Sequence, residues 1–288
     1  MLVVQMARDW KILSGEPVDS LLFRQAGDKE LRLLVMRPEE GGGAAPCIVW
    51  IHGGGFTSGT AEVLLPQCRY YSSLGYVCVS VEYRLMELDG ETPRPDGAQL
   101  EQQVADCREA VRYVRRHAEQ LGIDPRRIAL VGESAGGYLA AGVTTLPDDE
   151  EEEGSADAVS CVPDALILYN PITQLLGNWK RRIAAAVEES AQSWLERHTR
   201  AREMSPLLRL TAAHPPTLLM HGLADSIVPP EDSAEYAARL TELGVSAQLE
   251  LLPASSHAFA LFNYKASERE LALTLEKTTE FLKTVFEG

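Results

Sequence analysis

The 288-residue sequence has no long hydrophobic run and comparatively little positive charge. No window approaches the roughly 20 consecutive apolar residues of a membrane-spanning helix, which argues against an integral membrane protein. Its first residues, MLVVQMARDWK, lack the basic start and long apolar segment of a secretory signal, so we expect a cytoplasmic location. Lys and Arg number 27 against 42 Asp and Glu, a net charge of −15. Because such a surface repels phosphate backbones and anionic lipid headgroups, we expect no nucleic-acid partner and no membrane partner.

Cysteine is also scarce, with five residues and no C-x-x-C pair. Cys47 and Cys78 lie inside apolar, strand-like runs, which predicts buried thiols in a reducing compartment rather than disulfides or a zinc site. The chain lacks the H-E-x-x-H spacing of a zinc hydrolase, and its glycine-rich stretch HGGGF lacks the G-K-[ST] of a phosphate-binding loop. We therefore expect neither a metal nor a cofactor.

Short apolar runs alternate with amphipathic stretches along the chain. We predict strands at 31–38, 47–52, 76–84, 127–132, 164–170, 217–222 and 246–253. We predict helices at 98–121, 135–146, 231–243 and 267–286. This alternation indicates an α/β fold with a mostly parallel central sheet and helices on both faces.

Two segments interrupt the pattern. We treat residues 1–288 as a single domain in which 172–214, mainly helical in pattern and containing Trp179 and Trp194, forms a small helical cap insertion. The insertion either closes over a site or simply elaborates one end of the sheet. The acidic run 148–153 is expected to be a solvated loop.

The stretch GESAGG places Ser134 between an apolar run and a run of small residues. A serine on a strained strand-to-helix turn needs glycine on both sides, and the following helix N-terminus favours developing negative charge. The alternative is a chance G-x-S-x-G in an ordinary tight turn. The strand–turn–helix context favours a nucleophile at Ser134, with Glu133 either supporting the turn or merely tolerated there.

Upstream, HGGGF (52–56) follows another predicted buried strand. Glycines there can point backbone N–H groups into a cleft, and we expect an oxyanion hole formed by Gly54 and Gly55 with the N–H of Ala135. A flexible glycine-rich turn is the alternative, as expected for Gly41 to Gly43.

A nucleophilic serine needs a base and a carboxylate that orients it. Among the six histidines, His257 follows the last predicted strand in a loop of small residues. His52 belongs to the glycine loop, His221 abuts a strand end, His214 lies in a loop, and His117 and His198 are expected on charged helical surfaces. Asp225 follows the preceding strand; Glu231 and Asp232 are expected instead in the first turn of the next helix. A plain turn-forming role for Asp225 and a loop role for His257 are the alternatives.

Several motifs in order resemble the α/β-hydrolase superfamily, and most closely its hormone-sensitive-lipase-like and feruloyl- or acetyl-esterase-like carboxylesterases. They are HGGGF, VSVEYRL (79–85), the stretch 105–141, PPTLLMHGLADSIVP (215–229) and SSHAF (255–259). The resemblance covers about residues 30 to 286. It implies Ser134 as nucleophile, His257 as base, Asp225 as acid, and Gly54, Gly55 and Ala135 around the oxyanion. The N-terminal region is too short and polar for the family's helical cap, and MELDGETPRPDGAQL replaces the usual continuation after EYRL.

The sequence thus predicts a cofactor-independent serine hydrolase that acts on short-chain carboxylic esters, with acetyl as the favoured acyl group. Acetylated carbohydrates are candidate substrates through the resemblance alone. An arylformamidase- or peptidase-like amidase and an inactive hydrolase-fold binding protein are the alternatives. The oligomeric state stays open, with a homodimer as one candidate.

Overall fold

An eight-stranded mixed sheet runs through the centre of the protein in the order β1-β2-β4-β3-β7-β8-β9-β10. The computed structural model describes residues 18–39, 43–90, 92–94, 96–147, 159–176, 199–262 and 264–288. The strands are β1 (Asp19–Ala26), β2 (Lys29–Met36), β3 (Ala45–Ile51), β4 (Val77–Val81), β7 (Ile123–Glu133), β8 (Ala165–Tyr169), β9 (Thr217–Gly222) and β10 (Ala247–Leu252). In the order β4-β3-β7-β8-β9-β10, neighbouring strands pair in parallel. At one edge, β1 pairs antiparallel with β2, and β2 pairs antiparallel with β4. A separate two-stranded hairpin consists of β5 (Leu88–Asp89) and β6 (Thr92–Pro93).

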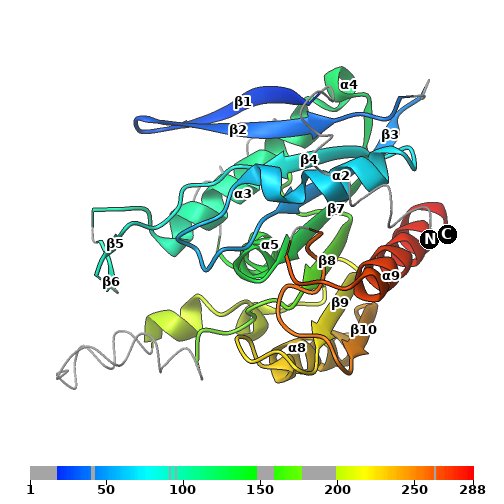
Figure 1. Ribbon diagram of the computed structural model, residues 1–288. Helices are drawn as coiled ribbons and strands as arrows, with labels where there is room; N and C mark the ends of the chain where they lie inside the picture. Colours follow the sequence, from blue (N-terminus) through cyan, green and yellow to red (C-terminus); the bar gives the residue numbers. More distant parts are fainter. Residues whose placement is uncertain are drawn as a thin grey trace.

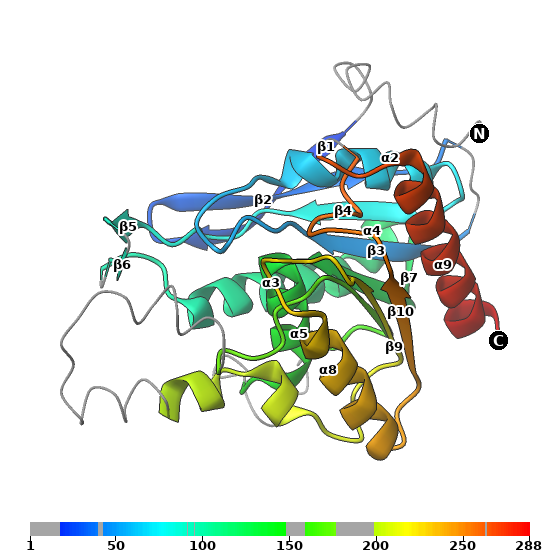
Figure 2. The same ribbon diagram turned by 60° about the horizontal axis from the view of Figure 1, so that its bottom comes forward.

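Helices cover both faces of this sheet. They are η2 (Ala61–Leu64), α2 (Leu65–Ser72), α3 (Leu100–Arg116), α4 (Ala118–Leu121), α5 (Ala135–Thr145), η4 (Pro206–Arg209), α8 (Pro230–Glu242) and α9 (Glu268–Glu287). Figure 1 labels the α-helices, and Figure 2 shows α2 and α9 on one face and α3, α5 and α8 on the other. The prediction of a mostly parallel sheet covered on both sides is confirmed.

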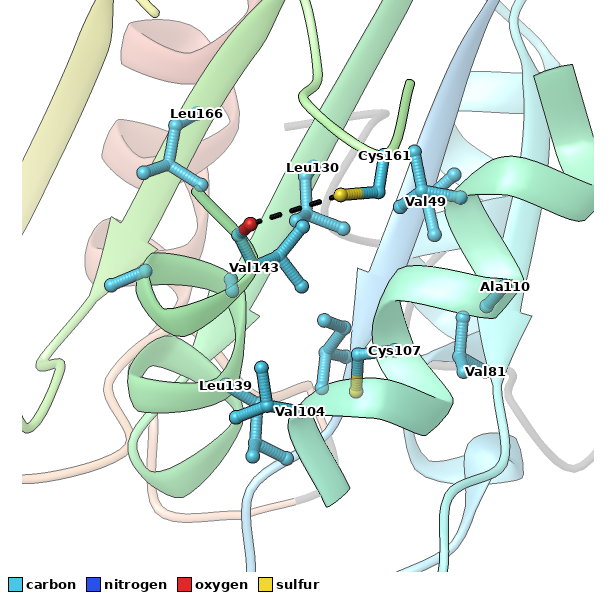
Figure 3. Packing of buried hydrophobic residues seen from close by; sticks show 14 of the residues in the cluster. Val49, Val81, Val104, Cys107, Ala110, Leu130, Leu139, Val143, Cys161 and Leu166 are labelled. Carbon is cyan, nitrogen blue, oxygen red and sulfur yellow. Dashed lines mark hydrogen bonds between the residues drawn. The ribbon is translucent and has the colours of Figure 1, made fainter. Parts of the chain in front are cut away.

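The alternation of side chains along each strand divides the core into two layers. In β3, Cys47, Val49 and Ile51 pack on the α3–α5–α8 side, whereas Ile48 and Trp50 pack on the α2–α9 side. Figure 3 shows the first layer, in which residues of α3 and α5 meet the valines and leucines of the strands. Burial of apolar surface on both faces explains why these strands are nearly continuous in hydrophobicity.

The cysteines belong to this core. All five are buried and none forms a disulfide, as the apolar runs around Cys47 and Cys78 predict. Cys107 and Cys161 lie in the layer that Figure 3 draws. Burial raises the pKa of the Cys107 thiol well above its ordinary value, with the neighbouring Asp106 acting in the same direction. These thiols therefore act as small apolar side chains.

Some predicted elements differ from the observed ones. Strand β1 was not predicted, because it is the edge strand and its residues are mostly half-buried or exposed. Helix α2 was not predicted either, although Pro66 stands at the helix start where proline is favoured. The predicted helix over 98–121 is divided at His117 into α3 and α4, and the His117 ring hydrogen-bonds to the carbonyl of Tyr113 one turn earlier.

The predicted cap is only partly within the structure. Residues 199–203 are helical and η4 follows, but 177–198, with Trp179, Trp194 and His198, lie outside the described residues. The acidic run 148–153 also lies outside them. Among the helices that are described, none is both long enough and apolar enough to cross a membrane.

Candidate active site

The sharp turn between β7 and α5 holds the serine predicted as nucleophile. Ser134 separates the strand from the helix with φ 55° and ψ −118°, a backbone region that residues with a Cβ rarely adopt. A Cβ on Gly132 would lie 2.2 Å from the carbonyl oxygen of Gly136, and one on Gly136 would lie 2.2 Å from that of Ile51. The two glycines are therefore required by the turn, and the turn holds Ser134 in place.

Ser134, His257 and Asp225 form a continuous hydrogen-bonded chain. His257 Nε2 lies 2.8 Å from Ser134 Oγ, and His257 Nδ1 lies 2.6 Å from Asp225 Oδ2. The imidazole is half-buried, and the serine and the aspartate are buried. With a proton on Nδ1 donated to the carboxylate, Nε2 is free to accept the proton of the serine hydroxyl.

Backbone contacts between two loops bring Asp225 and His257 together. Ala224 N donates to Ser255 O at 3.0 Å, which joins the loop after β9 to the loop after β10. A Cβ on Gly222 would lie 2.2 Å from Ser255 O, so the strand end must be glycine for the loops to approach. The backbone of Ala258, directly after the base, has a positive φ of 63°.

The carboxylate of Asp225 is held by four donors. Its Oδ1 accepts the backbone N–H groups of Ile227 and Val228 at 2.8 and 2.9 Å, while Oδ2 faces His257 and His221. Burial opposes ionisation, but the hydrogen bonds from His221, His257 and Val228 outweigh it and hold the pKa of Asp225 well below its ordinary value. Asp225 is therefore an anion at neutral pH, which suits it to orient an imidazole and to stabilise its charged form.

The HGGGF loop packs directly against the serine turn. A Cβ on Gly53 would lie 2.2 Å from Glu133 Oε2 and 3.2 Å from Ser134 Cβ. Gly54 and Gly55 have φ values of 121° and 61°. This close approach, which only glycine permits, brings the loop beside the serine.

His52 and its neighbours fix the shape of the same loop. The His52 ring stacks on Tyr83 with centroids 4.4 Å apart, and Tyr83 donates its hydroxyl to His52 O at 2.9 Å. Gln103 Nε2, from α3, donates to Phe56 O at 2.8 Å. Burial lowers the pKa of His52, so this histidine is neutral and supports the loop.

Glu133 connects the serine turn to β8. Its Oε1 accepts a 2.9 Å hydrogen bond from Asn170 Nδ2, and both side chains are buried. Burial raises the pKa of Glu133, while Asn170 and His257 act in the opposite direction. Asn170 was not singled out from the sequence, although a polar residue directly after the buried run ALILY was a usable signal.

The remaining predicted residues lie as follows. His221 is buried and contacts Asp225, and its position at the end of a strand did not reveal this contact. His214 lies in a loop, as predicted, and is buried there within 3.0 Å of Tyr236 Oη; burial lowers its pKa to about 4. His117 is half-buried against Tyr113. Glu231 and Asp232 occupy the first turn of α8, as expected.

The arrangement can carry out nucleophilic acyl transfer. The imidazole can take the serine proton, and Ala135 is the first residue of α5, where a backbone N–H has no carbonyl partner within the helix. Within the described ranges, no cluster of three or more His, Cys, Asp or Glu side chains is arranged to hold a metal ion.

Comparison with known sequences finds esterases among the relatives of this chain. The carboxylesterase NlhH of Mycobacterium tuberculosis is 30% identical over 236 residues, which cover 75% of this chain and 67% of that protein. Esterase LipC of the same organism is 27% identical over 228 residues. The chain spans a little over half the length of LipC and of another curated mycobacterial relative, LipM, at 54% and 55%.

Solved structures agree with the sequence relatives. A thermophilic esterase from Thermogutta terrifontis, in a butyrate-bound structure, has a TM-score of 0.79 and 29% identity, with 93% of this chain and 94% of that chain covered. The same esterase phosphorylated by paraoxon has a TM-score of 0.77 and 27% identity, over 93% and 94% of the two chains. Residues 33–240 match the BD-FAE family. The chain has the α/β-hydrolase fold and belongs to the BD-FAE family.

Proposed function

We propose that the protein is a serine carboxylesterase that hydrolyses short-chain esters through Ser134, His257 and Asp225. The observation that carries the proposal is the unbroken chain of 2.8 Å and 2.6 Å contacts from the serine hydroxyl through the imidazole to the carboxylate. The esterases among its relatives and structural neighbours support the same reaction.

Acylation begins at the serine. Ser134 Oγ attacks the ester carbonyl carbon while its proton passes to His257 Nε2. The tetrahedral intermediate then collapses, the bond to the alcohol oxygen breaks, and His257 returns the proton to that oxygen. The free alcohol leaves, and the acyl group stays on Ser134.

Deacylation repeats the sequence with water. His257 takes a proton from the water molecule that attacks the acyl-enzyme, and returns it to Ser134 Oγ as the carboxylic acid departs. Asp225 holds the imidazole with Nδ1–H toward the carboxylate in both halves, so Nε2 always faces the reacting oxygen.

The backbone N–H groups of Gly54, Gly55 and Ala135 are the proposed donors to the oxyanion. The support is the approach of the HGGGF loop to the serine turn, together with the N–H of the first residue of α5, which has no carbonyl partner within the helix. Removing one such donor typically costs about 10²- to 10³-fold in kcat.

Solved structures of a related esterase support a preference for small acyl groups. Structures of the Thermogutta esterase hold butyrate and propionate, which supports a preference for short chains. The resemblance to acetyl esterases favours acetyl as the acyl group. It also makes acetylated carbohydrates, in which a sugar hydroxyl is the alcohol part of the ester, candidate substrates. Rates on p-nitrophenyl acetate, butyrate and octanoate test the preference, and a steady rise toward octanoate would contradict it.

The central experiment replaces the nucleophile. Ser134→Ala is expected to lower kcat on p-nitrophenyl acetate by at least about 10⁴-fold and to abolish labelling by a fluorophosphonate probe, without lowering Tm. Ser73→Ala, at an exposed serine that ends α2, serves as the matched control and keeps full activity. Undiminished turnover by Ser134→Ala would refute the proposal. A wild-type protein that hydrolyses N-formyl-aryl amines faster than phenyl acetate would favour the amidase alternative.

A further inference from the structure

His221 is a second buried histidine in contact with the acid of the proposed triad. It lies in β9 and is fully buried. Its Nε2 lies 3.2 Å from Asp225 Oδ2 and 3.1 Å from Val228 O, and its Nδ1 lies 2.7 Å from Ser233 Oγ in α8. Neither His221 nor Ser233 takes part in the mechanism described above.

These contacts select one tautomer of the ring. Nε2 faces two oxygens that can only accept, the carboxylate of Asp225 and the carbonyl of Val228. A lone pair on Nε2 would point at both oxygens in a buried place where such repulsion is costly. The proton therefore resides on Nε2, and Nδ1 accepts the hydroxyl proton of Ser233, so the neutral ring satisfies all three contacts.

The consequence falls on the carboxylate that orients the base. Two backbone N–H groups hold Oδ1 of Asp225, whereas Oδ2, the oxygen that His257 binds, receives His221 as its second donor. A donor on this oxygen fixes the rotation of the carboxylate plane and therefore the direction in which the His257 ring points. Because Nε2 also contacts Val228 O, the same proton ties the Asp225 turn together.

We infer that His221 is a positioning residue, which holds Asp225 in the orientation that His257 needs, and that Ser233 fixes the tautomer in which His221 can do so. The inference rests on the proposed triad. If it is right, His221 in β9 and Ser233 in α8 affect the turnover rate, which residues that only pack the core would not do.

Four variants test the inference with p-nitrophenyl acetate as substrate. His221→Leu removes the donor, His221→Gln keeps an N–H near the position of Nε2, and Ser233→Ala removes the proton that sets the tautomer. His214→Leu is the matched control, since His214 is also buried and hydrogen-bonded but contacts Thr144 and Tyr236 rather than the triad. Measurements are kcat, KM, Tm and the far-downfield proton resonance of the short His257–Asp225 hydrogen bond.

We expect His221→Leu to lower kcat by about 10- to 100-fold with KM within about twofold, and to shift or broaden the downfield resonance. Ser233→Ala should do the same to a smaller extent, and His221→Gln should recover most of the rate. His214→Leu should lower Tm but leave kcat and the resonance unchanged.

Two results would overturn the inference. One is a folded His221→Leu protein with unchanged kcat and resonance. The other, decisive even if His221→Leu does not fold, is a Ser233→Ala protein unchanged in both. Failure of the underlying proposal is distinguishable, because it would leave Ser134→Ala active, whereas failure of this inference alone would leave Ser134→Ala inactive and the His221 variants fast.

Discussion

At the scale of single residues, the site depends on backbone conformations that most side chains forbid. Ser134, Gly54 and Gly55 all have positive φ, and Gly53 has Glu133 Oε2 in the space that a side chain would need. The strain is concentrated where the proposed nucleophile meets the proposed oxyanion donors, as is common at functional sites. The surrounding hydrogen bonds, such as that from Asn170 to Glu133, hold these conformations in place.

The Gly53→Ala substitution tests this crowding. Its Cβ would lie 2.2 Å from Glu133 Oε2 and 3.0 Å from the backbone oxygen of Glu133, so the Glu133 carboxylate, the HGGGF loop or both must move. We expect kcat/KM to fall by about 10²-fold, the loss typical of one misplaced oxyanion donor. Gly43→Ala, where a Cβ meets nothing within 4 Å, is the control and should retain the wild-type rate. A fully active Gly53→Ala would show that the approach is not needed.

Individual catalytic candidates were predictable because each follows a recognisable strand. Asp225 and His257 stand directly after the apolar runs that became β9 and β10, and the structure brings both to Ser134. Asn170 and His221 were missed because their importance depends on partners from other elements. The pairing of His221 with Ser233 of α8, for example, depends on how a helix packs against a strand, and no local pattern encodes it.

At the scale of elements, apolar periodicity identifies the buried helices and strands and misses the exposed ones. The parallel strands and the long helices have continuous or striped apolar residues, and they were predicted within a few positions. The edge strand β1 alternates weakly, although Gly27, with a φ of 65°, marks a turn into β2. The hairpin of β5 and β6 is too short for any period to show.

The C-terminal helix α9 provides a test at this scale. Ser267 caps it by accepting the N–H of Glu270, while Glu270 accepts the N–H of Ser267 at 2.7 Å. Replacing Ser267 by Ala leaves one N–H of the first turn without a partner, so we expect the free energy of unfolding to fall by about 1 kcal/mol. Urea denaturation measures the loss, with Thr284→Ala at the other end of α9 as control. An unchanged free energy of unfolding in Ser267→Ala would contradict the expected role of this cap.

At the scale of the whole molecule, the sheet assembles the site. The adjacent parallel strands β7, β8, β9 and β10 are followed by Ser134, Asn170, Asp225 and His257, respectively. Since parallel strands end at one edge of a sheet, residues far apart in the chain meet there. The order of the strands and of the site residues along the chain could be predicted from the sequence. The order of the strands within the sheet and the hydrogen bonds between the loops, such as Ala224 to Ser255, could not.

The stability of the whole molecule depends on pH, and the buried carboxyl group of Asp232 makes it fall as pH rises. Burial raises the pKa of Asp232 from 3.8 to about 6, and hydrogen bonds from Thr173 and Gln174 only partly offset it. Between about pH 4 and pH 6 the native state keeps a proton that the unfolded chain has released. The free energy of unfolding therefore falls as pH rises through this window.

Asp232→Asn removes this titration. The free energy of unfolding of the variant minus that of wild type should be larger at pH 7.5 than at pH 4. The increase should be up to about 3 kcal/mol, which corresponds to a pKa shift of about two units. Denaturant titrations at both pH values measure the difference, and Glu231→Gln, its exposed neighbour in α8, controls for loss of a negative charge. Equal stability differences at the two pH values would refute the expected role of Asp232.

The most direct test of the central claim is to locate the nucleophile chemically. Because the related Thermogutta esterase is phosphorylated by paraoxon, this protein should react with the same reagent and release one nitrophenolate per chain. Mass spectrometry of the digested protein is predicted to find a single diethylphosphoryl group on Ser134, and none in Ser134→Ala. An adduct on another residue, or an active protein that paraoxon does not modify, would contradict the account.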